Sequence, residues 1–257
     1  MSPYARILLC GEGPQDIGAD PYEEAGSRHM VNLEGWMQPL IRKLADCDAY
    51  LDFVRFPRSR ALAMPRNRAP RSDLPGHALA AFNAMRQAVI DQCDIVVFMA
   101  DNDRGKQRDR KRWREICEQV WAGFEAAGTP VCGVACIPIS ASEAWLLADH
   151  AAWGALGLAD ASDLPGVRSE AIWGERDDPD GNHPHRYFKR ICRKAGQDDT
   201  AHTRNLLGEH LSLTTLEANC PVSFVPFARA MKACLANRGC LSGFDFASIS
   251  PNEAPCQ

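Results

Sequence analysis

The stretch DIVVFMA at residues 94–100, followed by Asp101-Asn102-Asp103, decides the fold of this chain. Residues 95–100 are all apolar, which is typical of a strand inside a parallel sheet that is covered on both faces. The abrupt change to three polar residues marks the carboxyl end of that strand. We therefore expect Asp101 and Asp103 to lie at the edge of a buried sheet.

Two further apolar runs on either side of this stretch end in a similar way. Residues 5–10 (ARILLC) are followed by Gly11-Glu12-Gly13, and residues 130–139 by Ser140-Ala141-Ser142 and a helix expected over 143–150. Residues 50–56 are a further candidate strand. Between these strands, apolar residues recur at helical spacing over residues 31–47 and 74–92, and a third helix is expected to end near residue 127. Alternation of strands and helices predicts an α/β fold with a central, mostly parallel sheet flanked by helices.

The second half of the chain has a weaker pattern. Residues 153–184 are rich in Gly, Pro and Asp and are expected to be irregular, and helices are expected at 186–195, 206–219 and 224–237. The arginine-rich segment 55–71 is expected to be a loop. We predict an α/β domain over residues 1–150 and a mainly helical extension over residues 151–257 that packs on it as a cap.

Composition sets limits on function. The 257 residues carry a net charge of −4 and are 46% hydrophobic, as in an ordinary globular protein, so any contact with nucleic acid must come from a local basic patch. The eleven cysteines form no CxxC pair, which favours free thiols in a reducing cytosol, with a zinc site built from distant residues as the alternative. No signal peptide or membrane-spanning run is visible, so we predict a cytoplasmic protein without membrane contact.

Acidic residues follow three of the predicted strands. Glu12 lies between two glycines with Asp16 four residues later, Asp101 and Asp103 follow the central strand, and Glu143 begins a helix. The carboxyl ends of parallel strands meet at one edge of a sheet, so these acids can converge. Clustered carboxylates repel each other unless a cation lies between them, and hard oxygen ligands favour Mg²⁺ or Mn²⁺ over zinc.

Structural explanations remain open for each acid. Asp16 can cap a helix, Asp101 and Asp103 can belong to a solvated loop, and Glu143 suits the first turn of a helix that the serines before it would cap. A phosphate-binding P-loop is excluded because no GKS or GKT follows Gly11. An EF-hand is excluded because its later ligand positions fall in a basic run.

That basic run lies directly after Asp103. Clusters of this kind bind phosphate backbones through counterion release, although a solvated helix face is the ordinary alternative. The candidate nucleic-acid-binding residues are Arg104, Lys106, Arg108, Arg110, Lys111 and Arg112. Farther along, His183 and His185 could bind a metal or act as an acid, but a surface loop over residues 180–185 is the preferred interpretation.

The three acidic motifs, ILLCGEGPQD, DIVVFMADND and IPISASEAWLLAD, resemble in this order those of the TOPRIM-like proteins. More narrowly, the chain resembles the DUF4276 family and the related overcoming-lysogenization-defect nucleases. EAWLLAD is the most specific part. The resemblance covers residues 5–150, whereas residues 151–257 match only through PHRYFKR and NCPVSFVPF. It implies that the central sheet is TOPRIM-like.

The resemblance also implies a site that holds one or two Mg²⁺ or Mn²⁺ ions. The implied metal ligands are Glu12, Asp16, Asp101, Asp103, Glu143 and Ser142, with Ser140 as the alternative to Ser142. The implied catalytic residues are Glu12, Asp101, Asp103 and Lys106. The basic residue often found near such sites is not fixed by spacing here, so Lys106 is a candidate only.

The resemblance implies a metal-dependent endonuclease that cuts nucleic acid, with DNA expected before RNA. It further implies an ABC- or SMC-like ATPase as partner, often in defence against phage, and leaves a homo-oligomer open. One alternative is a TOPRIM-like scaffold that contacts the ATPase without catalysis. The other is a phosphoryl-transfer enzyme for a small nucleotide, which a deep closed pocket would favour over an open basic groove.

Overall fold

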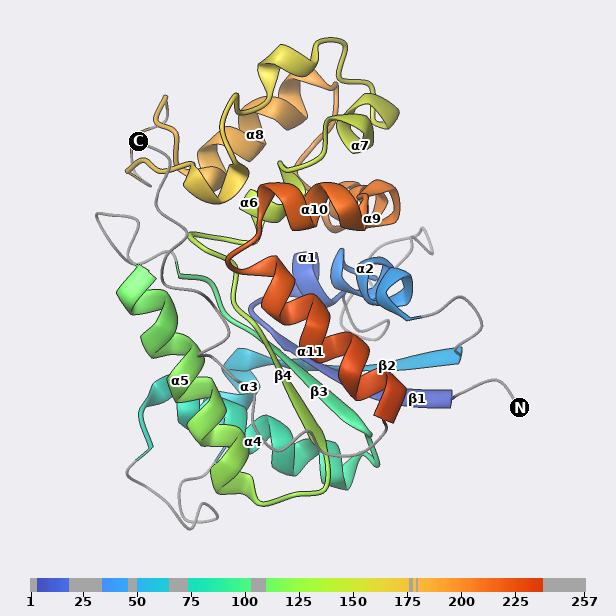
Figure 1. Ribbon diagram of the computed structural model, residues 1–257, viewed down its shortest axis with the longest axis vertical. Helices are drawn as coiled ribbons and strands as arrows, with labels where there is room; N and C mark the ends of the chain where they lie inside the picture. Colours follow the sequence, from blue (N-terminus) through green and yellow to red (C-terminus); the bar gives the residue numbers. More distant parts are fainter. Residues whose placement is uncertain are drawn as a thin grey trace.

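A single parallel sheet forms the centre of the molecule (Figure 1). The computed structural model describes residues 4–18, 34–45, 50–64, 74–102, 110–175, 178 and 180–237. Its strands are β1 (Tyr4–Gly11), β2 (Tyr50–Pro57), β3 (Ile95–Met99) and β4 (Cys132–Cys136), and they lie in the order β2-β1-β3-β4. All five residues of β3 are buried between neighbours on both sides. The predicted α/β fold and the interior position of this strand are confirmed.

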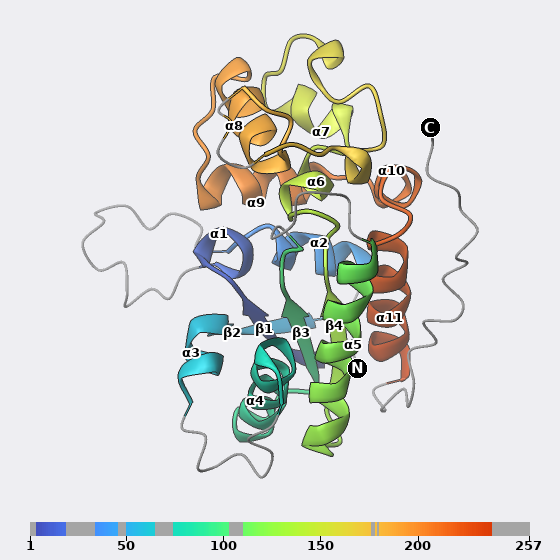
Figure 2. The same ribbon diagram turned by 90° about the vertical axis from the view of Figure 1, so that its left-hand side faces the viewer.

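Helices cover both faces of the sheet, which explains why β1 is apolar at consecutive positions. On one face, Ile7 and Leu9 pack with α2 (Met37–Leu44) and α11 (Phe224–Asn237). On the other face, Leu8 and Cys10 pack with α3 (Arg58–Ala63), α4 (Gly76–Ile90) and α5 (Arg110–Ala127). Figure 2 shows the sheet between these two layers.

A group of short helices lies over the carboxyl ends of the strands (Figures 1 and 2). After α6 (Glu143–Leu146), these helices are α7 (His150–Ala155), α8 (Pro184–Lys194), α9 (Ala201–His210) and α10 (Leu213–Asn219). We call residues 150–219 the cap. The predicted C-terminal helical region is thus confirmed. Its last helix, α11, leaves the cap and returns to the face of the sheet.

Several predicted boundaries are wrong. The single helix over residues 206–219 is two helices, because Ser212 accepts a hydrogen bond from Thr215 N and starts α10. The helix over 143–150 ends at Leu146, and Asp149 caps α7 instead. The arginine-rich loop over 55–71 contains the end of β2 and all of α3, while residues 65–71 lie outside the described part.

The cysteines and the membrane prediction can be checked on the described ranges. Cys10 and the seven other described cysteines are free and buried, as predicted for structural thiols. Cys47, Cys240 and Cys256 lie outside those ranges. Within the same ranges, none of the helices has the length and apolar character needed to cross a bilayer.

Candidate functional site

The predicted acids gather where the order of the strands changes direction. β1 and β3 are neighbours, but the chain leaves β1 for β2 on one side and then returns to β3 on the other. Ligands of open α/β sheets bind in the crevice at the carboxyl ends of the strands, at such a switch point. Glu12 follows β1 and Asp101 follows β3. Two of the predicted acids therefore follow the two strands that meet at the switch point.

Asp16 is buried in α1 (Pro14–Ile17), the short helix that follows Glu12. Its Oδ1 accepts a hydrogen bond from Trp36 Nε1 at 2.8 Å and another from the Ser142 hydroxyl at 3.4 Å. Gly35 permits this close approach, because a Cβ at position 35 would lie 2.1 Å from the carbonyl oxygen of Asp16. The explanation of Asp16 as a helix cap is wrong, because the N-cap residue of α1 is Gly13.

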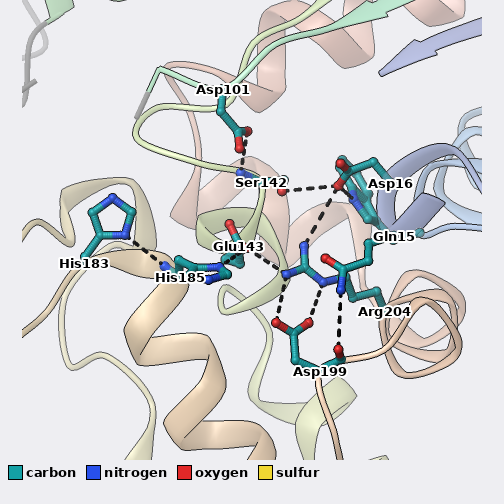
Figure 3. Close-up of polar contacts among 10 residues, drawn as sticks. Gln15, Asp16, Asp101, Ser142, Glu143, His183, His185, Asp199 and Arg204 are labelled. Carbon is teal, nitrogen blue, oxygen red and sulfur yellow. Dashed lines mark hydrogen bonds and ion pairs between the residues drawn. The ribbon is translucent and has the colours of Figure 1, made fainter. Parts of the chain in front are cut away.

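Arg204, on α9, brings a buried positive charge from the cap to the acids (Figure 3). Its Nη2 donates to Glu143 Oε1 at 2.7 Å, and its Nε donates to Asp199 Oδ1 at 2.8 Å. Its Nη1 lies 3.9 Å from Asp16 Oδ1. The guanidinium also lies over the ring of Phe188, 4.8 Å from the centroid. With only 2% of its side chain exposed, Arg204 is fully committed to these contacts.

His185, at the start of α8, contacts the same oxygen of Glu143 (Figure 3). Its Nδ1 lies 2.9 Å from Glu143 Oε1. His183 is buried, and its Nδ1 accepts the backbone N–H of His185 at 3.2 Å. The interpretation of residues 180–185 as a surface loop is therefore wrong for both histidines.

Ser142 links Asp101 to Asp16. The backbone N–H of Ser142 donates to Asp101 Oδ1 at 2.9 Å, while its hydroxyl donates to Asp16. Ser142 is the N-cap residue of α6, as predicted, but its side chain makes no capping hydrogen bond to this helix. Burial raises the pKa of Cys136 at the end of β4, and the charges of Asp16 and Asp101 raise it further. Both acids therefore lie near the end of β4 as well.

Glu12 is 44% exposed, in contrast to this buried group. It forms an ion pair with Arg58, the first residue of α3, which follows β2. Arg58 Nη2 lies 3.3 Å from His77 Nδ1, at the start of α4. The site thus has a buried part around Arg204 and a partly exposed part around Glu12 and Arg58.

The two buried acids have opposite pKa shifts. Burial raises the pKa of Asp16 to about 6, against the lowering effects of Arg204 and the Trp36 hydrogen bond. Burial also acts to raise the pKa of Glu143, but the hydrogen bond with His185 and the contact with Arg204 outweigh it and lower this pKa to about 2. Glu143 is therefore a stable anion, whereas Asp16 is a carboxylate with too little positive charge beside it.

The remaining predicted residues are placed only in part. Asp103, Arg104, Lys106 and Arg108 lie outside the described residues, and Arg110 is described only as the first residue of α5. Lys111 is exposed on α5, 3.9 Å from Glu115, and Arg112 is half-buried on the same helix. Because α5 follows β3, these residues lie on the side of the carboxyl ends of the strands.

Arg204, Asp199, Arg58 and Trp36 contact the predicted acids but were not found from the sequence. Each stands in a segment where the pattern suggests another role. Arg204 belongs to a polar helical segment, AHTRNLLGEH, in which an arginine is usually solvated. Arg58 belongs to a run of arginines without a clear partner. For Trp36, the neighbouring Gly35 was the only feature of the local sequence that indicated close packing against another segment.

The grouping of possible metal ligands and the similarity to known proteins both bear on the identity of the site. Within the described ranges, no three His, Cys, Asp or Glu side chains are grouped so that they could hold a metal ion; Asp103 falls outside these ranges. Comparison with protein-family models, with curated proteins and with solved structures finds no match for the chain.

Proposed function

We propose that this chain is a Mg²⁺- or Mn²⁺-dependent endonuclease of the TOPRIM-like type that cuts nucleic-acid phosphodiesters. The observation that carries the proposal is the position of Glu12 and Asp101 at the carboxyl ends of two neighbouring strands, at the switch point of the sheet. Acids placed there by the fold are available to a ligand in the crevice. The basic start of α5 and Arg58 add positive charge on the same side.

The fit of a divalent cation differs between the two parts of the site. Glu143 Oε1 already contacts Arg204 and His185, so the buried part of the site contains a positive charge that the protein itself supplies. Glu12 is 44% exposed and Asp101 is half-buried, and both offer the hard oxygen donors that Mg²⁺ prefers. We therefore assign the ion to Glu12 and Asp101, with Asp103 as the third ligand suggested by the sequence.

Each side chain has a separate task in this proposal. A bound Mg²⁺ would supply charge stabilisation at the phosphodiester and lower the pKa of an attacking water. Ser142 holds Asp101 in place through its backbone N–H, and Arg204 fixes Glu143 and the loop that carries Ser142. The cap contributes Arg204 and His185 to the contacts that bury Glu143, and so helps to exclude water from this part of the site.

The proposal includes an ABC- or SMC-like ATPase as partner and a role in defence against phage, with DNA as the first substrate to test. The scaffold alternative has one observation in its favour. Arg204 neutralises Glu143 without a metal, so these residues also serve simply to hold the cap on the sheet. Calorimetric titration with Mn²⁺ separates the two. Absent binding, or binding unchanged in Glu12→Gln, would favour the scaffold.

The decisive variant is Asp101→Asn. Asparagine keeps an oxygen that can accept the Ser142 N–H, so the fold is retained while the charge is lost. Nicking of supercoiled plasmid with Mg²⁺ or Mn²⁺ is expected to slow by about a hundredfold. RNA is tested in parallel.

The matched control is Glu217→Gln, which removes an exposed acid on α10 and should leave the rate unchanged. All assays are repeated with the ATPase present. If the wild-type chain cleaves neither DNA nor RNA in either condition, the nuclease proposal fails.

A further inference from the structure

Arg58 occupies the position beside the acids that the sequence left without an assigned basic residue. Pro57, at the end of β2, is in register with Gly11, so Arg58 and Glu12 are the next residues on two paired strands. The charge of Arg58 also reaches Cys10, whose pKa is raised to about 12 by burial and lowered in part by this arginine. Arg58 is thus fixed beside Glu12 by the register of the sheet.

The guanidinium of Arg58 is only partly used. Nη1 pairs with Glu12 and Nη2 lies 3.3 Å from His77 Nδ1. Nε is buried and has no hydrogen-bond partner among the described residues. Buried donors in native proteins normally have an acceptor, so the guanidinium of Arg58 has hydrogen-bonding capacity that the described residues do not use.

Arg204 cannot take this role, although it lies nearby. Its side chain is 2% exposed and it contacts three carboxylates, whereas Arg58 is 20% exposed and pairs with one. An ion pair whose acid is this exposed contributes little to stability, so exchange of Glu12 for another anion costs little. A guanidinium binds phosphate oxygens in the same fork geometry as a carboxylate.

We propose that Arg58 is the phosphate-binding residue of this site and that Glu12 occupies it while no substrate is bound. The inference deepens the proposed function and rests on it for the identity of the substrate, a phosphodiester or a nucleotide phosphate. Arg58 binds the phosphate through Nη1, the guanidinium nitrogen that Glu12 releases. His77 supports the guanidinium from the side of α4.

The test measures binding without turnover. Anisotropy of a short fluorescein-labelled single-stranded oligonucleotide is followed at low salt in EDTA, with the full chain. Arg58→Ala is expected to weaken binding about tenfold or more, since a hydrogen bond to a charged group is lost. Arg60→Ala is the matched control, because Arg60 is an exposed arginine on the same helix and the net charge changes equally. It should change binding by less than about twofold.

Glu12→Gln supplies a readout that a structural ion pair would not give. It removes the competitor of the phosphate, so binding in EDTA should become tighter, while Arg58→Ala makes it weaker. A pair that only stabilises the fold would shift both variants in the same direction. Melting temperatures of both variants are measured to confirm that they are folded.

A second arm uses a fluorescent mononucleotide. If the mononucleotide binds as tightly as the oligonucleotide and this binding depends on Arg58, the ligand of the site is a small nucleotide. If the oligonucleotide binds much more tightly, the ligand is nucleic acid. The inference is overturned if Arg58→Ala binds both probes as well as the wild type, or if Glu12→Gln weakens binding as Arg58→Ala does.

These results are separable from the proposed function. Arg58-dependent binding without cleavage in any metal would keep this inference and remove the nuclease. Cleavage that needs Asp101 but has the same kcat and KM in Arg58→Ala would keep the nuclease and remove this inference.

Discussion

Asp16 and Glu143 show how the distance to one cation sets the state of a buried acid. Arg204 lies 2.7 Å from Glu143 but 3.9 Å from Asp16. The closer acid has its pKa lowered to about 2, and the more distant one has its pKa raised to about 6 by burial. A buried carboxylate without a close partner favours the protonated form. Asp16 is therefore expected to take up a proton just below neutral pH.

This difference predicts an unusual pH dependence of stability. The folded pKa of Asp16, about 6, lies above its ordinary value of 3.8, so the folded state binds the proton more tightly. The free energy of unfolding should then rise as the pH is lowered from 7 towards 4, by up to about 3 kcal/mol. Urea unfolding in EDTA at a series of pH values measures this rise.

Asp16→Asn is the variant that isolates the effect. It keeps an oxygen for Trp36 but cannot titrate, so the rise between pH 7 and pH 5 should be smaller than in the wild type. Glu143 acts in the opposite direction only below about pH 4.5, where its own stabilising ionisation is lost. Equal slopes for the wild type and Asp16→Asn between pH 7 and pH 5 would contradict the pKa assigned to Asp16.

Single residues were predicted with uneven success, for a physical reason. Asp101 was placed at a strand end because an apolar run followed by acids is a local pattern. Arg204 was not found, because its partners Asp16 and Glu143 are distant in sequence and meet it only when the cap folds over the sheet. His185 was assigned to the surface because its neighbours are polar, although its own side chain faces Glu143.

At the scale of elements, one carboxylate from the cap holds the start of α11. Glu170 lies in the 3-10 helix η3 (Ser169–Ala171) and is buried. Its Oε1 accepts Ser223 N at 2.6 Å and its Oε2 accepts Val222 N at 3.0 Å, just before α11 begins. An acid at this position satisfies free N–H groups and interacts well with the helix dipole. The Ser223 hydroxyl in turn accepts from Trp145 Nε1 at 2.8 Å.

Glu170→Gln should therefore destabilise the whole chain. Glutamine can replace only one of the two acceptor oxygens, so a buried N–H is left unpaired at a cost of about 1–3 kcal/mol. The midpoint of thermal or urea unfolding measures the loss. Glu175→Gln removes an exposed acid nearby and should have no effect. A variant as stable as the wild type would mean that Glu170 does not hold α11.

Elements in the first half were predicted better than those in the second. Strands β1, β3 and β4 are short apolar runs bounded by polar residues, and this pattern does not depend on tertiary contacts. The cap helices are short and depend on individual caps, such as Asp149 for α7 and Ser212 for α10. Hydrophobic periodicity cannot locate a cap that interrupts a continuous pattern, which is why residues 206–219 were predicted as one helix.

At the scale of the whole molecule, the core crosses the predicted domain boundary at residue 150. Trp145 packs against Phe224 and Phe227 of α11, with ring centroids 5.2 Å and 5.4 Å apart. The same cluster contains Ile7 of β1 and Met231 of α11. The sequence predicted a helical C-terminal region but contained no sign that its last helix, α11, returns to the sheet, because the apolar face of α11 could equally pack against the cap.

This shared core predicts that residues 1–150 do not fold alone. Without α11, one face of the sheet loses one of the two helices that pack on it and exposes side chains such as Trp145. Exposed apolar area costs roughly 25 cal/mol per Å², and a domain has a stability of only about 5–15 kcal/mol, so losing a whole covering helix is sufficient to unfold it. The fragment should lack dispersed amide signals in NMR, and the full chain should unfold in one transition. A fragment 1–150 with native-like dispersion would instead support two independent domains.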